Sequence, residues 1–478
     1  ASGHATLVTG GNPAQHGIIG NNWYNRALKE RFYALADIDH SVLNGKHGPG
    51  VGTSPANLTS TTIGDELVAA TQGQSRVFSV SVKDRAAIAM GGRGGKAFWF
   101  DKGTGRFTSS TYYYASNETL PAWVREWNAQ PIADGLVDAA GSWDLLKKPS
   151  SYRKLDSDQR AFELPPKGLG NVFPHTLPPA QSPERYSAIR YTPFGDQLTV
   201  DFAKTLIRQE GLGKQGHTDM LNLSLSCTDY IGHAFGPESL EAEDNLLRVD
   251  QLLAEFLDFL DRHIGLENTL VVLAADHGVD SIPESREQQH HHAGALKAKD
   301  IQAALHTFTQ QRFGTEEDLV EAIVSPYIYL NEDVIQQLGL NLQIVEEAMA
   351  AAVKSMDGIA DAVCRSHLMA GTVVDTPIMK RVVNSFVPER FGNIMMILSQ
   401  FHLISDGDRI KAATHGTPYT YDTFVPIMFA GMDIPAQEIR RLVGPEDIAP
   451  TLAVLLGTLP PSGSTGTALT EVLSTTKP

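Results

Sequence analysis

The hydrophobic positions of this chain repeat with two periods, one typical of strands and the other of helices. Residues 76–82 alternate between apolar and polar side chains, which predicts a strand, and the apolar run 269–275 predicts a buried one. A strand predicted at 220–226 precedes residues 240–264, whose apolar side chains recur at the spacing of one helix face. The order strand, helix, strand indicates parallel strands, and we expect 220–226 and 269–275 to be neighbours.

Elsewhere the pattern separates a core from two other stretches. Residues 131–192 carry many Pro, Ser and Lys residues without a sustained period, so we expect an irregular surface insertion. Residues 286–404 show short strand and helix patterns, which predict a small α+β insertion. The core then comprises 1–285 and 405–478, and we expect an α/β fold with a mostly parallel central sheet covered by helices on both faces. Further core elements are predicted as helices at 5–9, 62–70, 120–128, 196–210 and 445–456, a hairpin at 96–114 and a strand at 425–430.

The composition is typical of a globular protein and narrows the choice of partners. With 478 residues, of which 42% are hydrophobic and 20% charged, the chain can bury a large core. The net charge of −16 argues against nucleic acid as a main partner, because phosphate backbones are bound by basic surfaces, although local cations can still bind a small anion. No apolar run is long enough to span a bilayer. The two cysteines, Cys227 and Cys364, are too few for a disulfide framework.

Three separated clusters combine carboxylate or imidazole groups with small or turn-forming residues. Asp229 and His233 follow a predicted strand and stand four positions apart, so one helical turn can direct both at the same ion. Asp276 and His277 follow a second strand, and His415 lies between Thr and Gly. Any one cluster alone is as well explained by a helix cap or a buried hydrogen-bonded pair. Together they favour two divalent metal ions, and the mixture of His and Asp ligands suits zinc.

Two cations follow the first predicted strand. Lys83 and Arg85 stand two positions apart, so both can point into one crevice and hold a phosphoryl or carboxylate group. The alternative is a solvated pair of loop charges with Asp84 as a local partner. For these residues taken alone, that alternative is the better explanation.

The chain resembles the alkaline phosphatase superfamily at several separate places. Residues 3–10 and 16–21 resemble the segment that carries the nucleophile, residues 82–85 match the phosphate-binding Lys and Arg of the monoesterase members, and residues 447–453 resemble the closing helix. The three clusters described above match the zinc ligands in order and spacing. The chain is most similar to the branch that holds nucleotide pyrophosphatase/phosphodiesterases and the single-chain bacterial alkaline phosphatases with a threonine nucleophile.

The resemblance implies an alkaline phosphatase-like fold with two Zn²⁺ ions as cofactors. It assigns Asp229, His233 and His415 to one zinc ion and Asp276 and His277 to the other. Two close divalent ions neutralise the attacking and leaving oxygens of an in-line phosphoryl displacement.

The resemblance also implies the other catalytic groups. Lys83, Arg85 and the side chain of Asn21 are expected to hold the non-bridging oxygens of the phosphoryl group. The nucleophilic threonine is expected just upstream of Ala1, together with one more Asp ligand and a first strand central to the sheet. The reaction is then expected to pass through a covalent phosphothreonine.

These inferences combine into one expected function and two alternatives. We expect a zinc-dependent alkaline phosphatase that hydrolyses the monoesters of phosphorylated small molecules and acts as a monomer, without a nucleic acid scaffold or a membrane span. Because family members are typically exported, the resemblance implies a periplasmic or secreted enzyme. The alternatives are a nucleotide pyrophosphatase/phosphodiesterase, and a non-catalytic protein that binds metal or phosphate.

Overall fold

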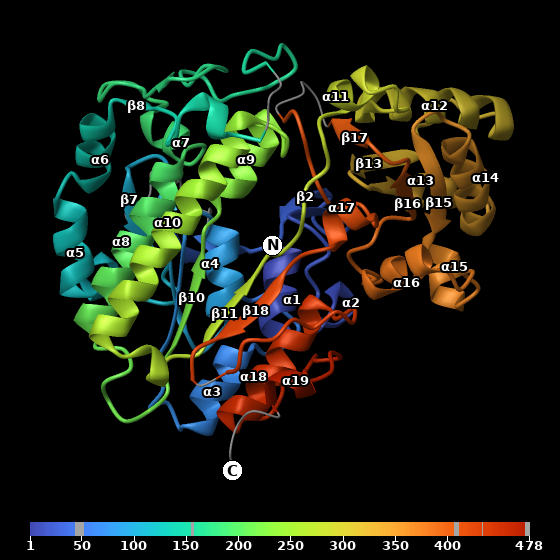
Figure 1. Cartoon of the computed structure of the whole chain (residues 1–478). Helices are drawn as coiled ribbons and strands as arrows, with labels where there is room; N and C mark the ends of the chain where they lie inside the picture. Colours follow the sequence, from blue (N-terminus) through green and yellow to red (C-terminus); the bar gives the residue numbers. More distant parts are fainter. Residues whose placement is uncertain (44–51, 154–156, 406–410, 433, 474–478) are drawn as a thin grey trace. The chain divides into compact units, whose positions relative to one another are not determined.

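The computed structural model describes residues 1–43, 52–153, 157–405, 411–432 and 434–473, and it divides the chain into two compact units (Figure 1). Unit 1 comprises Ala1–Ile18, Leu35–Asp276 and Val425–Pro478, and unit 2 comprises Ile19–Ala34 and His277–Phe424. The α+β insertion predicted at 286–404 lies inside unit 2. Unit 2 also contains residues 19–34, which the sequence analysis placed in the core.

Unit 1 contains the strands and helices that were predicted for the core. Its strands are β3 (Ala36–Ser41), β4 (Gly52–Thr53), β5 (Val77–Ser81), β6 (Lys96–Asp101), β7 (Arg106–Thr108), β8 (Ser142–Trp143), β9 (His175–Thr176), β10 (Met220–Ser224), β11 (Val271–Ala274) and β18 (Ile427–Ala430). Its helices are α1 (Ser2–Thr9), α2 (Pro13–His16), α3 (Ile63–Ala70), α4 (Asp84–Gly91), α5 (Ala122–Ala129), α6 (Ile132–Ala140), α7 (Arg185–Ile189), α8 (Pro193–Glu210), α9 (Cys227–Phe235), α10 (Leu240–His263), α18 (Ile448–Leu456) and α19 (Thr470–Leu473).

A four-stranded sheet in the order β10-β5-β6-β7 forms the centre of unit 1. The β10–β5 and β5–β6 pairs are parallel, and β7 is antiparallel to β6. Strand β5 is buried along its whole length, because alternate side chains pack on opposite faces. Phe78 and Val80 belong to the same apolar cluster as Phe202 of α8, whereas Val77 and Ser79 face the glycines of α3 and α4. The predicted α/β class, with helices on both faces of the sheet, is confirmed.

One predicted pairing is wrong. We expected the strands at 220–226 and 269–275 to be neighbours, but β10 pairs with β5, and β11 pairs with β18 in an antiparallel ladder. The apolar pattern of a strand shows that the strand is buried but does not identify the neighbour that buries it. Pairing between segments separated in the sequence therefore had to come from the structure.

In its described part, the stretch 131–192 contains more regular structure than the predicted irregular insertion. It contains α6 and the short antiparallel pair β8–β9, and the side chain of Trp143 is fully buried. The carboxylate of Asp244 on α10 anchors this stretch, accepting hydrogen bonds from Trp143 Nε1 at 2.6 Å and from Tyr152 Oη at 2.5 Å. A buried carboxylate needs such donors. The order therefore depends on a contact about 100 residues away in the sequence, which no local pattern reveals.

Unit 2 is built around a four-stranded antiparallel sheet in the order β13-β14-β16-β15. Tyr24 joins residues 19–34 to this sheet, since its ring lies 5.4 Å from that of Tyr329 and its hydroxyl donates to Glu321 at 2.7 Å. The elements of unit 2 are β1 (Asn22–Asn25), β2 (Glu30–Tyr33), α11 (Pro283–Gln288), β12 (Gly294–Lys297), α12 (Ala298–Phe313), β13 (Val320–Val324), β14 (Tyr327–Leu330), α13 (Glu332–Gln337), α14 (Leu342–Lys354), β15 (Ile359–Cys364), α15 (Arg365–Ala370), α16 (Pro377–Asn384), β16 (Ile394–Leu398), β17 (His402–Ser405) and α17 (Thr420–Thr423).

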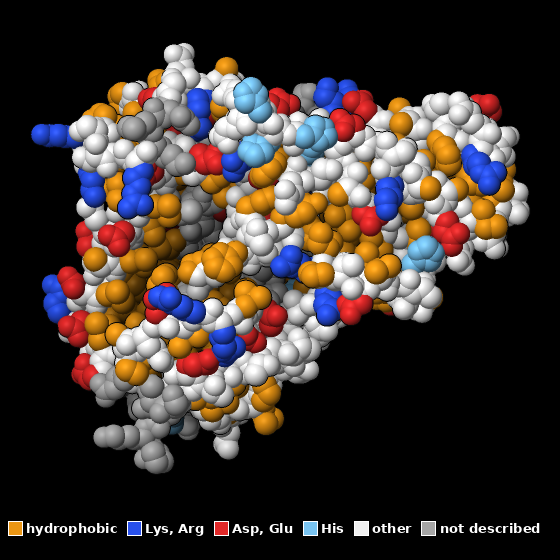
Figure 2. Space-filling model, turned by 45° about the vertical axis from the view of Figure 1, so that its right-hand side comes forward, with side chains coloured by type: hydrophobic (Ala, Val, Ile, Leu, Met, Phe, Trp, Pro, Cys, Tyr) orange, Lys and Arg blue, Asp and Glu red, His pale blue; other side chains and the backbone are white. Residues whose placement is uncertain are grey.

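The surface and the cysteines are ordinary. Basic and acidic side chains are intermixed over the face drawn in Figure 2. Cys227 and Cys364 are both buried free thiols. Among the helices in the described ranges, none combines the length and the apolar character needed to cross a bilayer.

Replacing Asp244 by Ala should destabilise unit 1 by about 3–5 kcal/mol. The substitution leaves four donors without their acceptor, namely Trp143 Nε1, the Leu146 amide, Tyr152 Oη and Arg248 Nε. Urea unfolding followed by tryptophan fluorescence measures the change. The exposed Asp144 in the anchored stretch provides the control, and Asp144→Ala should stay within about 0.5 kcal/mol of the unsubstituted protein. Equal stability of the two variants would contradict the anchoring role.

Candidate active site

The carboxyl ends of β5 and β10 lie at the same level, because the parallel register places Ser81 opposite Ser224. A chain of hydroxyl groups runs along this edge. Ser81 Oγ lies 3.0 Å from Ser226 Oγ, which lies 2.7 Å from Ser224 Oγ, and the backbone amide of Lys83 donates to Ser81 Oγ at 3.0 Å. The network is largely buried, so it fixes the two strand ends relative to each other. This edge is where open α/β sheets usually bind ligands.

His4, in the first turn of α1, connects this network to Asp276. Its Nε2 lies 2.9 Å from Ser224 Oγ, and its Nδ1 lies 2.8 Å from the carboxylate of Asp276. Burial lowers the pKa of His4, although Asp276 opposes the shift. The absence of a side chain at Gly3 allows α1 to lie this close to Asp276, because a Cβ at Gly3 would be 2.1 Å from the Asp276 carbonyl oxygen. The candidate ligand Asp276 is therefore held by a residue that sequence analysis quoted only as part of a motif.

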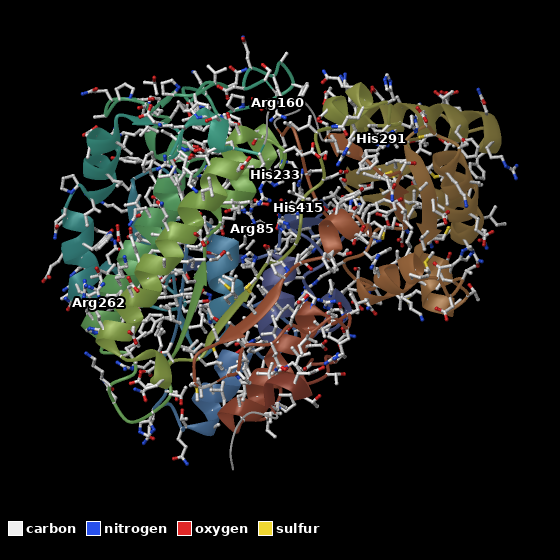
Figure 3. The ribbon with its side chains drawn as sticks, viewed as in Figure 1. Arg85, Arg160, His233, Arg262, His291 and His415 are labelled. Carbon is white, nitrogen blue, oxygen red and sulfur yellow. The ribbon has the colours of Figure 1, made fainter. Side chains whose placement is uncertain are left out.

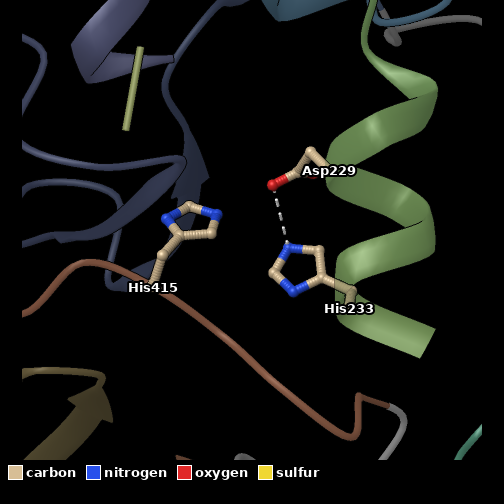
Figure 4. Close-up of side chains that lie close together, drawn as sticks. All are labelled: Asp229, His233 and His415. Atoms are coloured by element: carbon tan, nitrogen blue, oxygen red, sulfur yellow. Dashed lines mark ion pairs between the residues drawn. The ribbon is translucent and has the colours of Figure 1, made fainter. Parts of the chain in front are cut away.

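Helix α9 carries two of the candidate metal ligands. Asp229 lies in its first turn and His233 in its last, and His233 Nε2 is 3.4 Å from Asp229 Oδ1 (Figure 4). The spacing of four places both side chains on the same helix face, as predicted. Lys83 forms an ion pair with Asp229, and both side chains are mostly buried, with relative exposures of 5% and 15%. The three groups therefore form one cluster of ionisable side chains inside unit 1.

Charged side chains of unit 1 gather near His4 and near Tyr191. The carboxylate of Asp276 and the ammonium of Lys83 both act on the buried imidazole of His4 in α1. The charges of Asp229 and Arg85 both act on the hydroxyl of Tyr191, and Asp229 also forms the ion pair with Lys83. Electrostatic effects of this kind weaken with distance, so these groups lie close to one another. Figure 3 labels Arg85 on α4 and His233 on α9. The structure thus brings together both predicted cations and two of the predicted carboxylates.

The remaining predicted site residues belong to unit 2. His277 and His415 are neighbours there, since their rings stack with centroids 3.4 Å apart. Asn21 directly precedes β1, and its carbonyl oxygen accepts a hydrogen bond from Ala34 N at 3.0 Å.

Asp422 fixes the two loops that carry His277 and His415. Its Oδ2 accepts hydrogen bonds from Gly416 N at 2.9 Å, from Thr417 N at 2.7 Å and from Thr417 Oγ1 at 2.7 Å. Its backbone carbonyl accepts a hydrogen bond from Gly278 N at 2.7 Å. One buried residue therefore connects the chain next to both histidines.

Sequence analysis did not identify His4, Asp422 or the serine network. His4 and Asp276 are 272 positions apart in the sequence, so only the fold brings them together. Asp422 lies seven positions after His415 and carries no pattern that distinguishes it from a surface acid. The repeated Ser residues at the ends of β5 and β10 are the one signal that was available.

Comparisons with known proteins agree with this architecture. The family model for type I phosphodiesterase / nucleotide pyrophosphatase matches residues 1–417. The alkaline phosphatase PhoV of Synechococcus elongatus is 34% identical over 99% of this chain and 84% of its own length. The alkaline phosphatase PafA of Elizabethkingia meningoseptica is 34% identical over 99% of this chain and 85% of its own length.

Two solved structures of PafA match the fold. The wild-type structure gives a TM-score of 0.88 at 33% identity, and it covers 98% of this chain and 89% of the PafA chain. The second is a PafA mutant in which one threonine, one asparagine, one lysine and one arginine are replaced. It gives a TM-score of 0.90 at 33% identity, with the same coverage. The predicted alkaline phosphatase-like fold and the family resemblance are confirmed.

Asp196 on α8 supports the start of α9 and should make stability depend on pH. Its Oδ1 accepts a hydrogen bond from Cys227 N at 3.1 Å, and burial raises its pKa to about 7. In the unfolded chain an Asp has a pKa of about 3.9, so between roughly pH 4 and 7 the folded form binds more protons. Stability should therefore fall as pH rises through this range.

Asp196→Asn should reduce this decline by up to about 1.4 kcal/mol per pH unit, because the variant has no proton to lose at this position. Urea unfolding of both proteins at pH 5, 6, 7 and 8 measures the two slopes. Parallel slopes would show that Asp196 titrates normally.

Proposed function

Because this chain belongs to the type I phosphodiesterase / nucleotide pyrophosphatase family, we propose that it acts on phosphate esters, and specifically as an alkaline phosphatase on phosphate monoesters. The observation that carries this proposal is the position of Lys83 and Arg85. Both follow the buried strand β5, where Lys83 pairs with Asp229, Arg85 and Asp229 both act on Tyr191, and Lys83 and Asp276 both act on His4. The similarity to the alkaline phosphatases PhoV and PafA over 99% of this chain supports the same activity.

The two cations distinguish a monoester from a diester. A monoester dianion carries one more negative charge than a diester, so a pair of cations stabilises the monoester more strongly. Arg85 offers a planar fork of donors and Lys83 a compact point charge, and together they can contact several phosphoryl oxygens. A diesterase has a second ester group to accommodate, and a further positive charge stabilises its substrate only slightly.

The PafA mutant gives support at the level of individual positions. Its replaced lysine and arginine stand two positions apart, as Lys83 and Arg85 do, and its replaced asparagine precedes the lysine by 62 positions, as Asn21 precedes Lys83. We therefore assign Asn21, Lys83 and Arg85 to binding of the non-bridging oxygens. In a loose phosphoryl transition state these oxygens carry much of the charge. The covalent phosphothreonine and its nucleophile stay predictions.

The candidate ligands are suitable for zinc. Asp229 and His233 present an oxygen and a nitrogen ligand on one face of α9, and His415 is a further imidazole of the type that zinc binds. In our proposal these three hold one Zn²⁺ and Asp276 and His277 hold a second. When bound, the metal pair supplies Lewis acidity, which favours ionisation of the attacking hydroxyl group and neutralises charge on the leaving oxygen. His4 keeps the carboxylate of Asp276 oriented, and such supporting hydrogen bonds usually increase metal affinity.

The cellular setting is also a proposal. We propose that the substrates are phosphorylated small molecules and that the enzyme acts as a monomer in the periplasm or outside the cell, by analogy with the family. Assay of p-nitrophenyl phosphate against bis-p-nitrophenyl phosphate tests the reaction itself. Faster turnover of the diester would identify a phosphodiesterase instead, and absence of turnover of either ester by the zinc-loaded protein would identify a binding protein.

Neutralising both cations should damage monoester hydrolysis selectively. In Lys83→Ala/Arg85→Ala, kcat/KM for p-nitrophenyl phosphate should fall by roughly 10²–10⁴, because two charge-assisted contacts are lost. Hydrolysis of bis-p-nitrophenyl phosphate should fall by a clearly smaller factor. The matched control is Lys102→Ala/Arg106→Ala, which removes two exposed cations of the β6–β7 hairpin and should leave both rates unchanged. Equal losses on the two substrates would count against the monoester assignment.

Asp422→Ala should weaken zinc binding by roughly 10–100-fold, because the loops next to His277 and His415 lose their common acceptor. Competition between the metal-free protein and a chromophoric chelator measures this affinity without reference to turnover. Asp375→Ala is the control, since it removes an exposed carboxylate of the same unit that pairs with Lys380. Unchanged zinc affinity in Asp422→Ala would show that these loops do not hold the metal.

A further inference from the structure

The ring of Tyr230 lies close to two cations of unit 1. The ammonium of Lys83 is 4.4 Å from the ring centroid, and the guanidinium carbon of Arg190 is 4.7 Å from it. Both distances are within the range of a favourable cation–π interaction. Tyr230 directly follows the candidate ligand Asp229 on α9.

Several contacts hold Tyr230 in place. Arg190 Nη1 donates a hydrogen bond of 2.7 Å to its hydroxyl, and Arg190 Nη2 donates to Ser187 Oγ at 3.0 Å. The ring of Tyr191 lies 4.9 Å from that of Tyr230. Arg190 follows the end of α7, so the hydroxyl of Tyr230 is bound to one element while its backbone belongs to another. A ring fixed at its hydroxyl and at its backbone has little freedom to rotate.

The ammonium of Lys83 needs a second interaction partner, because the carboxylate of Asp229 has two roles. The carboxylate of Asp229 forms the ion pair with Lys83 and is also a candidate metal ligand. A carboxylate that shares its charge with a divalent ion attracts an ammonium group less strongly. The ring face of Tyr230 is unaffected by that competition, since its attraction for a cation comes from the ring quadrupole. The ring also does not use all three N–H donors of the ammonium, so donors remain for other acceptors.

We propose that Tyr230 is the positioning residue for Lys83: its ring face keeps the ammonium directed at the phosphoryl group, and Arg190 holds the ring in place through the hydroxyl. Tyr230 acts through Lys83 and does not itself react. This inference rests on the proposed function, because it gives Lys83 the task of binding phosphate.

A double-mutant cycle tests the role, with the dissociation constant of inorganic phosphate for the zinc-loaded protein, measured by calorimetry, as its first readout. Tyr230→Leu removes the ring and should weaken phosphate binding roughly tenfold. Tyr230→Phe keeps the ring and should weaken it by no more than about threefold, as should Arg190→Met, which removes the support of the hydroxyl. In a Lys83→Ala background, Tyr230→Leu should cost less than about twofold, because the group that it positions is already absent.

The same double-mutant cycle, measured as kcat/KM for p-nitrophenyl phosphate, should give the same coupling between Tyr230 and Lys83. A tenfold loss from Tyr230→Leu in both backgrounds would overturn the proposal, because it would show that the ring acts independently of Lys83. Unchanged phosphate binding in Tyr230→Leu would also overturn it. Thermal unfolding of each variant shows whether the fold is retained. The matched control is Tyr114→Leu, which removes a ring that carries Lys96 at 5.1 Å and should leave phosphate binding unchanged.

A failure of the proposed function would give a different experimental result from a failure of the role of Tyr230. If the unsubstituted protein binds phosphate but turns over no monoester, the alkaline phosphatase assignment fails. The coupling between Tyr230 and Lys83 in phosphate binding is still measured in that case, so the two ideas are tested separately.

Discussion

The ion pair between Lys83 and Asp229 is the interaction on which the rest of the site in unit 1 depends. Lys83 is the N-cap residue of α4 after the end of β5, and Asp229 lies in the first turn of α9 after β10. Two charges so largely removed from water are tolerable only when they satisfy each other. The parallel register of β5 and β10 makes their meeting possible, because it ends both strands at the same level. The sheet therefore determines where the charges are, and the charges determine what can bind there.

Charged groups in this cluster contact more than one partner. Neighbouring polar groups that take no part in the reaction hold them in position. Lys83 is shared between Asp229 and the ring of Tyr230. Asp276 is held by His4, which is in turn held by Ser224. Such outer contacts restrict the rotation of a side chain without using its reactive atoms. Pre-organisation matters for phosphoryl transfer, where the protein contributes mainly position and electrostatic stabilisation.

Sequence reasoning identified the elements well and their long-range partners poorly. The strand at 76–82 and the helix at 240–264 were found because alternation and helical periodicity are local properties. Lys83 and Arg85 were proposed because they follow the predicted strand 76–82, and Asp229 and His233 because they follow the strand 220–226 at a spacing of four. By contrast, the pairing of β11 with β18 could not be deduced, nor could the anchoring of Trp143 by Asp244. A hydrophobic pattern shows that a segment is buried, and several segments of similar pattern are interchangeable as partners.

Asp422 shows why supporting residues are hard to recognise in a sequence. A lone carboxylate in a polar segment resembles any surface acid, yet here it is 3% exposed and receives three donors on a single oxygen. Burial raises the pKa of Asp422, and the bonds from Thr417 and Gly416 oppose that shift. The loop donors favour the carboxylate form of Asp422, and that carboxylate in turn holds the loop that carries the donors. This mutual dependence exists only in the folded chain. The supporting residues of such a site consequently have to be read from contacts, whereas the reactive ones can be read from spacing.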